Sequence, residues 1–261
     1  KPGRLGIHDG LHRPQGDPVL TDQMRYATAS PDGAAAPDGA GAQCGGQRLK
    51  RSLIAGRQWL EKHASAVNAL NVFPVPDGDT GTNMLLTMNA ALAEVERSPE
   101  NSVSVIAHAV AHGALMGARG NSGVILSQIF RGFARVLDDQ PTFSAQVFAE
   151  AAQEACDTAY QGVVKPVEGT ILTVAREAAR ATREAAAQTD DVVEVLAQAV
   201  EVARVTNALT PELLPVLKEA GVGDAGAGQL EQEGVDRIVL STAFGLVRIV
   251  GHVLVLLNRN R

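Results

Sequence analysis

Apolar residues recur at helical spacing through most of this 261-residue chain, and this spacing restricts the fold more than any other feature. In the first such segment they lie on one side of a helix, at Leu49, Leu53, Leu60, Val67 and Leu70. Further helical segments follow at about 84–95, 103–116, 121–137, 144–161, 167–187 and 192–207, and Pro211 is placed to begin a short eighth that ends near Gly221. Few segments alternate with the period of a strand, so we expect an all-α fold.

The composition excludes some classes of protein. Hydrophobic residues make up 45% of the chain, which is enough for a packed core. The formal net charge is −6 and aromatic residues are only 3%, so the basic stripe and stacking rings of a nucleic-acid-binding protein are missing. The two cysteines, Cys44 and Cys156, form neither a metal-ligand motif nor a disulfide framework, which fits a reducing cytoplasm.

The two ends of the chain differ from its middle. Residues 1–46 are rich in Gly, Pro, Asp and Ala and show no apolar periodicity, so we expect a disordered segment or one extraneous to the fold. Residues 238–257 are apolar, but Arg248 and His252 lie within them, and a central Arg is costly in lipid. We therefore expect no membrane span, and interpret this stretch as a buried helix or the product of a truncated end.

Four connections between the expected helices are rich in glycine, at 77–83, 117–123, 165–170 and 221–228. Glycines before a helix let the backbone approach an anion at the positive end of the helix dipole, and hydroxyls at Thr82, Ser122 and Thr170 can add donors. Asp77 and Asp79 are one residue apart, and a divalent cation such as Mg²⁺ would offset their repulsion. These features together predict a Mg–nucleotide site at one rim of a helical bundle.

A simpler interpretation is helix capping. Asp79 or Thr80 can cap the second helix, and Asn121 or Ser122 the fourth, and for either loop alone both interpretations stay open. The recurrence of Gly-rich helix starts favours a ligand site. Other phosphate and metal motifs do not fit, because the chain has no GxxxxGK[ST] loop and the spacing after Asp77 is not that of an EF-hand.

The segments NALNVFPVPDGDTGTNM and GALMGARGNSGVILSQIFRGFA closely resemble the DhaL-type nucleotide-binding domain of bacterial fatty acid kinase. This domain is related to the ADP-binding L subunit of dihydroxyacetone (glycerone) kinases. KPVEGTILTVAREAA and LKEAGVGDAGAGQL look like the later two loops of the family, although the fourth loop of the family usually reads closer to DAGGQGL. The resemblance covers residues 47–230 and predicts one domain there, followed by an atypical tail at 231–261.

The resemblance implies an eight-helix antiparallel barrel whose loops at one end hold ATP or ADP with two Mg²⁺ ions. Asp77 and Asp79 match the metal-binding carboxylates and are the expected catalytic residues, and Asn71 lies near the place of a third metal-binding aspartate in the L subunits. The residues expected to bind the nucleotide are Thr80, Gly81, Thr82, Asn83, Gly120, Asn121, Ser122, Gly123, Thr170 and Asp224.

The implied reaction is transfer of the γ-phosphoryl group of ATP to a fatty acid carboxylate, presented by a separate lipid-binding (DegV-like) partner protein. Two alternatives stay open: an L-type subunit of glycerone kinase, working with a dihydroxyacetone-binding subunit, and a truncated, non-catalytic nucleotide-binding module. Thr80 favours the first function, because the L subunits usually carry His at that place. A cytoplasmic location without nucleic-acid partners is expected, and a homodimer is left open.

Overall fold

The computed structural model describes residues 43–93 and 95–227. This part of the chain contains eight helices: α2 (Gly46–Ala69), α3 (Thr80–Ala93), α4 (Val103–Gly117), α5 (Gly120–Val136), α6 (Ala145–Gln161), α7 (Ile171–Ala186), α8 (Val192–Leu213) and α9 (Pro215–Ala220). Two three-residue strands, β1 (Gln43–Gly45) and β2 (Thr142–Ser144), pair antiparallel with Cys44 opposite Phe143. The predicted all-α fold is confirmed, and the number of helices agrees with the sequence pattern.

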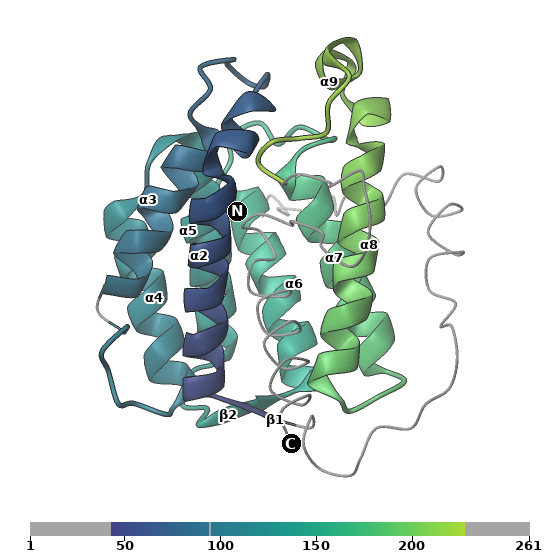
Figure 1. The fold of residues 1–261 in the computed structure, drawn as a ribbon. Coiled ribbons are helices and arrows are strands. Elements are labelled where there is room, and N and C mark those ends of the chain that lie inside the picture. Colours follow the sequence, from purple (N-terminus) through teal and green to yellow (C-terminus); the bar gives the residue numbers. More distant parts are fainter. Residues whose placement is uncertain (1–42, 94, 228–261) are drawn as a thin grey trace, which may run out of the picture.

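The seven long helices run antiparallel to their neighbours in sequence, and each packs against the next along the chain (Figure 1). The short helix α9 contacts the end of α8. All connections therefore lie at two opposite ends. One end, named here the loop end, carries segments 70–79, 118–119, 162–170 and 221–227, and the strand end carries β1 and β2.

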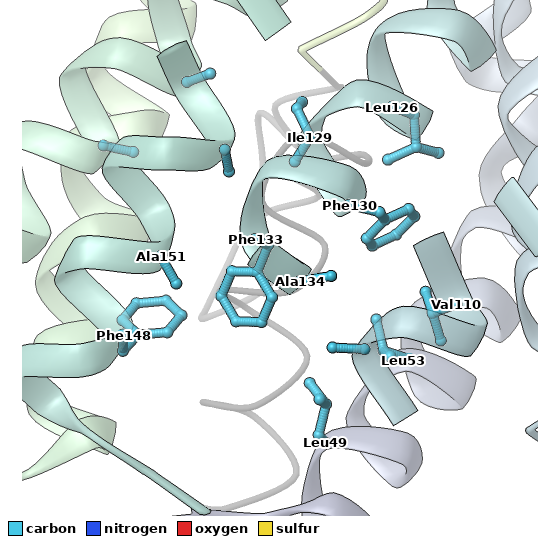
Figure 2. Close-up of a cluster of buried hydrophobic side chains, with 14 of the residues drawn as sticks. Leu49, Leu53, Val110, Leu126, Ile129, Phe130, Phe133, Ala134, Phe148 and Ala151 are labelled. Carbon is cyan, nitrogen blue, oxygen red and sulfur yellow. The ribbon is translucent and has the colours of Figure 1, made fainter. Parts of the chain in front are cut away.

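Helix α5 lies at the centre of the hydrophobic core and contacts α3, α4 and α6. Figure 2 shows its side chains between those of α2 and α4 on one side and those of α6 on the other. Leu126, Ile129, Phe130 and Phe133 of α5 are all buried. Burying each such side chain stabilises the fold by about 1.5–3 kcal/mol, which explains why the apolar stripe seen in the sequence determines how this helix packs.

Helices α5 and α6 approach each other closely at Gly132. A Cβ atom at this position would lie 2.4 Å from the carbonyl oxygen of Glu154 and 2.7 Å from the Cα of Ala155. Only glycine allows these two backbones to meet without moving apart. The contact holds the two helices together about one turn before the end of α5.

Besides the start of α3, which lies at Thr80 rather than at 84, three boundaries differ from the sequence prediction. Residues 43–46 were expected to lie outside the fold, but they form β1 and the first residue of α2, and Cys44 is buried. Helix α7 begins at Ile171 rather than at 167, because Gly169 has a left-handed φ of +81° and Thr170 caps the helix.

The third difference concerns Pro211, which was expected to open the last helix but lies inside α8. Proline lacks the N–H that would bond to the carbonyl of Asn207, and the hydroxyl of Thr210 donates to that carbonyl instead at 2.7 Å. The helix therefore continues to Leu213, and Pro215 takes the first position of α9.

No helix within 43–93 and 95–227 combines the length and apolar character needed to cross a bilayer. The expectations for residues 1–42 and for the apolar stretch at 238–257 fall outside the described residues.

Candidate functional site

The loops of the loop end surround a pocket of about 600 Å³. Most of the residues predicted from the sequence line it, although they come from segments more than 150 positions apart. The first loop and α3 contribute Asn71, Asp77, Asp79, Thr80 and Asn83. The later segments contribute Gly120, Asn121, Ser122, Thr170 and Asp224. Folding thus brings together the four glycine-rich connections that the sequence singled out.

Asn71 organises the loop that carries the two aspartates. Its side-chain amide donates to the carbonyl of Val75 at 3.0 Å, and its oxygen accepts from the backbone N–H of Asp79 at 3.3 Å. The side chain is buried, and the Phe73–Pro74 peptide bond within the loop is cis. The structure therefore gives Asn71 a role in shaping the loop, and its predicted role as a metal ligand stays a prediction.

Asp77 and Asp79 are both exposed at the pocket. Within the described part of the chain, neither carboxylate has a hydrogen-bond donor or an ion-pair partner. Among the same residues, no group of three or more His, Cys, Asp or Glu side chains is placed to hold a metal ion. The described part of the chain therefore offers a pair of carboxylates here, and other oxygen ligands would complete the shell of a bound metal.

The N-terminus of α5 lines the same pocket as this pair. Gly120, with φ +57°, Asn121 and Ser122 form the first turn and line the pocket. Arg119 occupies the N-cap position, but its side chain makes no capping hydrogen bond. In the described structure the backbone N–H groups of residues 120–122 have no acceptor. They are the unsatisfied donors that make a helix N-terminus attractive to an anion.

Helix α7 also begins at the pocket, but its first N–H groups are already used. Thr170 accepts through its hydroxyl from Leu172 N at 3.4 Å, and Asp224 accepts through its carboxylate from Ile171 N at 3.0 Å. Compared with the start of α7, the start of α5 is therefore the more open to a ligand, and capping is the role that the structure shows for Thr170.

Asp224 ties the fourth loop to α7. Its Oδ2 atom also accepts from Ala227 N at 2.9 Å, and the side chain is buried. Burial raises the pKa of this carboxyl from 3.8 to about 6, although backbone hydrogen bonds from Ala227, Ile171 and Gly226 act in the opposite direction. The residue lines the pocket and at the same time holds two of its walls together.

Three residues expected to bind the nucleotide do not line the pocket. Gly81 packs against α2, where a Cβ atom would lie 2.3 Å from the carbonyl oxygen of Ala64. Thr82 exchanges two hydrogen bonds with the side chain of Asn68. Gly123 sits against Thr87, whose hydroxyl would be 2.3 Å from a Cβ atom. The structure shows these residues fixing the helices that carry the loops.

The sequence reasoning missed the apolar part of the pocket. Phe73, Val75, Val124, Val163 and Val164 line it. Val164 is 97% exposed and Val75 57% exposed, so both present apolar surface to solvent at the pocket. The sequence did contain an indication of this apolar surface, because valines lie within connections that are otherwise polar and rich in glycine.

Comparison with known proteins identifies a family that this chain matches. The family model described as the DAK2 domain matches residues 74–231. An uncharacterized protein of Staphylococcus saprophyticus is 51% identical over 181 residues, and protein YloV of Bacillus subtilis is 50% identical over the same length. In each case the match covers 69% of this chain and 33% of the relative, so the chain spans about a third of the length of these relatives.

Proposed function

The chain belongs to the DAK2 domain family, the nucleotide-binding L-type domains of dihydroxyacetone kinases, and we propose that its pocket binds ATP or ADP together with Mg²⁺. The observation that carries this proposal is a juxtaposition. Two carboxylates that have no protein partner among the described residues, Asp77 and Asp79, and the uncapped first turn of α5 line one pocket. Carboxylates attract a cation and helix N-termini attract an anion, and a metal–phosphate complex uses both.

The size and lining of the pocket suit a nucleotide. A volume of about 600 Å³ lies within the range of about 300–1,000 Å³ that is usual for small-molecule sites. Val124, Ile125 and Val163 provide an apolar surface on which a nucleobase could be buried. The polar and apolar parts of the lining thus match the two halves of such a ligand.

The donor set fits Mg²⁺. Both candidate ligands are carboxylate oxygens, which this hard cation prefers, and Mg²⁺ commonly takes one or two carboxylates and completes its shell with phosphate oxygens and water. Asp77 and Asp79 would hold the metal, and Asn71 is a further candidate ligand. When bound, Mg²⁺ neutralises negative charge on the phosphates. The presence of two ions follows from the family resemblance.

The residues of the chain would act mainly by binding and orienting. The N–H groups of Gly120, Asn121 and Ser122 would hold phosphate oxygens, and Asp224 with Thr170 would keep the wall formed by α7 in place. No general base stands out among the lining residues. This arrangement suits phosphoryl transfer to an acceptor that is already ionised, because positioning and charge neutralisation then supply most of the catalysis.

For the longer proteins of which this chain spans about a third, we propose a kinase that transfers the γ-phosphoryl group to a fatty acid carboxylate. The acid would be presented by a lipid-binding partner of the DegV-like type, and the reaction would take place in the cytoplasm. The exposed Val75 and Val164 at the pocket support an approach by a partner, because exposed apolar side chains often mark contact surfaces.

Isothermal titration of the full chain with ADP, with and without Mg²⁺, tests the proposal. We expect Mg²⁺-dependent binding by the wild type and a loss of that dependence in Asp79→Ala. Asp190→Ala is the matched control, because Asp190 is exposed between α7 and α8 at the strand end. Unchanged binding by Asp79→Ala would exclude the metal site.

A kinase assay on the longer protein then identifies the acceptor. Phosphorylation of a fatty acid on its binding partner supports the proposed reaction. Phosphorylation of dihydroxyacetone on its binding subunit favours the glycerone kinase alternative, and nucleotide binding without either reaction favours a non-catalytic module.

A further inference from the structure

Glu168 lies directly before the Gly169–Thr170 turn, and its partly exposed side chain bonds to other residues of the protein. Its Oε1 atom accepts from Arg176 Nη1 at 2.7 Å and from the hydroxyl of Tyr160 at 3.2 Å. Its Oε2 atom accepts from the hydroxyl of Thr173 at 2.7 Å. Glu168 does not line the pocket, whereas Thr170 two residues later does.

A chain of hydrogen bonds connects Glu168 to the backbone of the turn. The N–H of Gly169 donates to Thr173 Oγ1 at 2.9 Å, and the hydroxyl of Thr173 in turn donates to Glu168. Gly169 has a φ of +81°, and a Cβ atom there would lie 2.8 Å from the Cβ of Leu214. The turn is therefore held from one side by these bonds and packed on the other against the residue between α8 and α9.

Arg176, the hydrogen-bond partner of Glu168 at the other end of this path, is itself held in place. The guanidinium of Arg176 also pairs with Glu177 at 3.1 Å, and the Arg176 side chain is only 15% exposed. Burial alone would raise the pKa of Glu168, but the hydrogen bonds from Arg176 and Thr173 outweigh it and hold the pKa below its ordinary value. The carboxylate thus stays charged and bonded at neutral pH.

We propose that Glu168 is a positioning residue of the pocket: through Thr173 it fixes the backbone of Gly169, and so the place of Thr170 at the pocket wall. The inference rests on the proposed nucleotide function of the same pocket. The proposal also gives Glu168 a different role from that of the candidate metal ligands Asp77 and Asp79. Both oxygens of Glu168 are occupied by donors of the protein, whereas in the described part of the chain the carboxylates of Asp77 and Asp79 have none.

The test uses the full chain and three changes along the hydrogen-bond path. Glu168→Ala removes the carboxylate, Thr173→Val breaks the link to Gly169 while leaving the Glu168–Arg176 pair in place, and Glu168→Gln keeps the length and an acceptor for Thr173. The matched control is Glu184→Gln, because Glu184 accepts a similar bond from Arg180 on the same helix, more than three turns beyond Ile171.

We expect Glu168→Ala and Thr173→Val each to raise the Kd for Mg–ADP about tenfold, because removing a residue that positions a binding residue commonly weakens binding to this extent. Glu168→Gln should recover part of the affinity, and Glu184→Gln should leave it unchanged. The double variant of Glu168→Ala and Thr173→Val should bind no more weakly than either single variant, because both changes break one path. The Mg²⁺ concentration for half-maximal binding should stay constant.

Thermal unfolding of each variant accompanies the titrations, so that a general loss of structure is recognised. A normal Kd in both single variants overturns the inference while leaving the proposed function intact. Additive losses in the double variant, or a shift in the Mg²⁺ requirement, also overturn it, because Glu168 would then act directly on the ligand or the metal. A wild-type chain that binds no Mg–ADP contradicts the proposed function itself.

Discussion

The two ends of the helical bundle join helices in contrasting ways. At the strand end, Ser144 and Asp191 cap α6 and α8 through their side chains, and β1 pairs with β2. At the loop end, α5 begins without a side-chain cap. All the glycines with positive φ among the described residues, Gly78, Gly120, Gly169 and Gly221, lie at this loop end.

If the proposed function holds, this difference separates the end of the bundle that mainly stabilises the fold from the end that binds the ligand. At the strand end, each of the helices α2, α4, α6 and α8 has at least one N–H group of its first turn bonded within the protein, and the rings of Phe143 and Phe148 stack in the core nearby. In the described structure, the loop end leaves solvent-accessible N–H groups at the start of α5 and the carboxylates of Asp77 and Asp79 without protein partners, so they are available to a ligand. Changes at the strand end should therefore alter unfolding more than binding, and changes to the unpartnered groups of the loop end should do the opposite.

The largest expected effect is at Phe143, next to the strand end. Its ring stacks on Phe148 with centroids 5.8 Å apart and meets Phe133 edge to face at 6.1 Å. Phe143→Ala should lower the free energy of unfolding by about 3–5 kcal/mol, because it leaves a cavity in the core. Urea unfolding measures this loss, and the ADP affinity of the folded variant should stay near that of the wild type.

Phe73→Ala is the control for this comparison, because Phe73 is only partly buried and lines the pocket. It should cost less stability than Phe143→Ala and weaken ADP binding more. Equal losses of stability in the two variants would contradict the contrast between the ends.

A second effect concerns pH and Asp224. The pKa of this carboxyl is raised by burial to about 6 in the folded chain, against 3.8 as its ordinary value, so the folded state binds the proton more tightly. The unfolding free energy should therefore fall as pH rises from about 4 to 6, by about 3 kcal/mol for this group. Asp224→Asn should remove this fall, because its amide does not titrate.

Urea unfolding of the nucleotide-free wild type and of Asp224→Asn at several pH values between 4 and 7 checks this expectation. The difference between the two curves isolates Asp224 from the other carboxyls. Parallel curves would show that the buried carboxyl does not titrate in this range.

The smallest expected effect on stability comes from giving α5 a serine side-chain cap like that of α6. Arg119→Ser places a capping hydroxyl before the first turn and should stabilise the chain by up to about 1 kcal/mol relative to Arg119→Ala. The same hydroxyl would occupy an N–H group needed by a phosphate, so Mg–ADP should bind more weakly to Arg119→Ser than to Arg119→Ala. Thermal unfolding and titration of the two variants give both quantities, and equal affinities would argue against a ligand at this turn.

Much of this organisation could be predicted from the sequence. Helical periodicity located the long helices, because each buries one apolar stripe, and α4 and α6 lie within a residue or two of their expected limits. Periodicity could not reveal β1, because three residues carry no pattern and Gln43 pairs with Ser144 across 101 positions. It also could not show that Thr210 lets α8 continue past Pro211.

The sequence predicted which residues belong to the candidate site better than it predicted what each of them does. The glycine-rich connections identified Asp77, Asn121 and Thr170, and the structure brings all three to one pocket. Whether a polar residue at a helix start caps the helix or faces a ligand depends on the partners that the fold supplies. Asp224 accepts a hydrogen bond from Ile171 of α7, which lies 53 positions away, and no local sequence pattern predicts this contact.

The central claim is that the uncapped start of α5 receives phosphate. Backbone amide NMR of the full chain during titration with Mg–ADP, and separately with adenosine, tests it most directly. The account predicts large shifts of the amides of Gly120, Asn121 and Ser122 with Mg–ADP and much smaller ones with adenosine, while the capped start of α6 stays unchanged. Equal shifts with the two ligands, or none at residues 120–122, would contradict it.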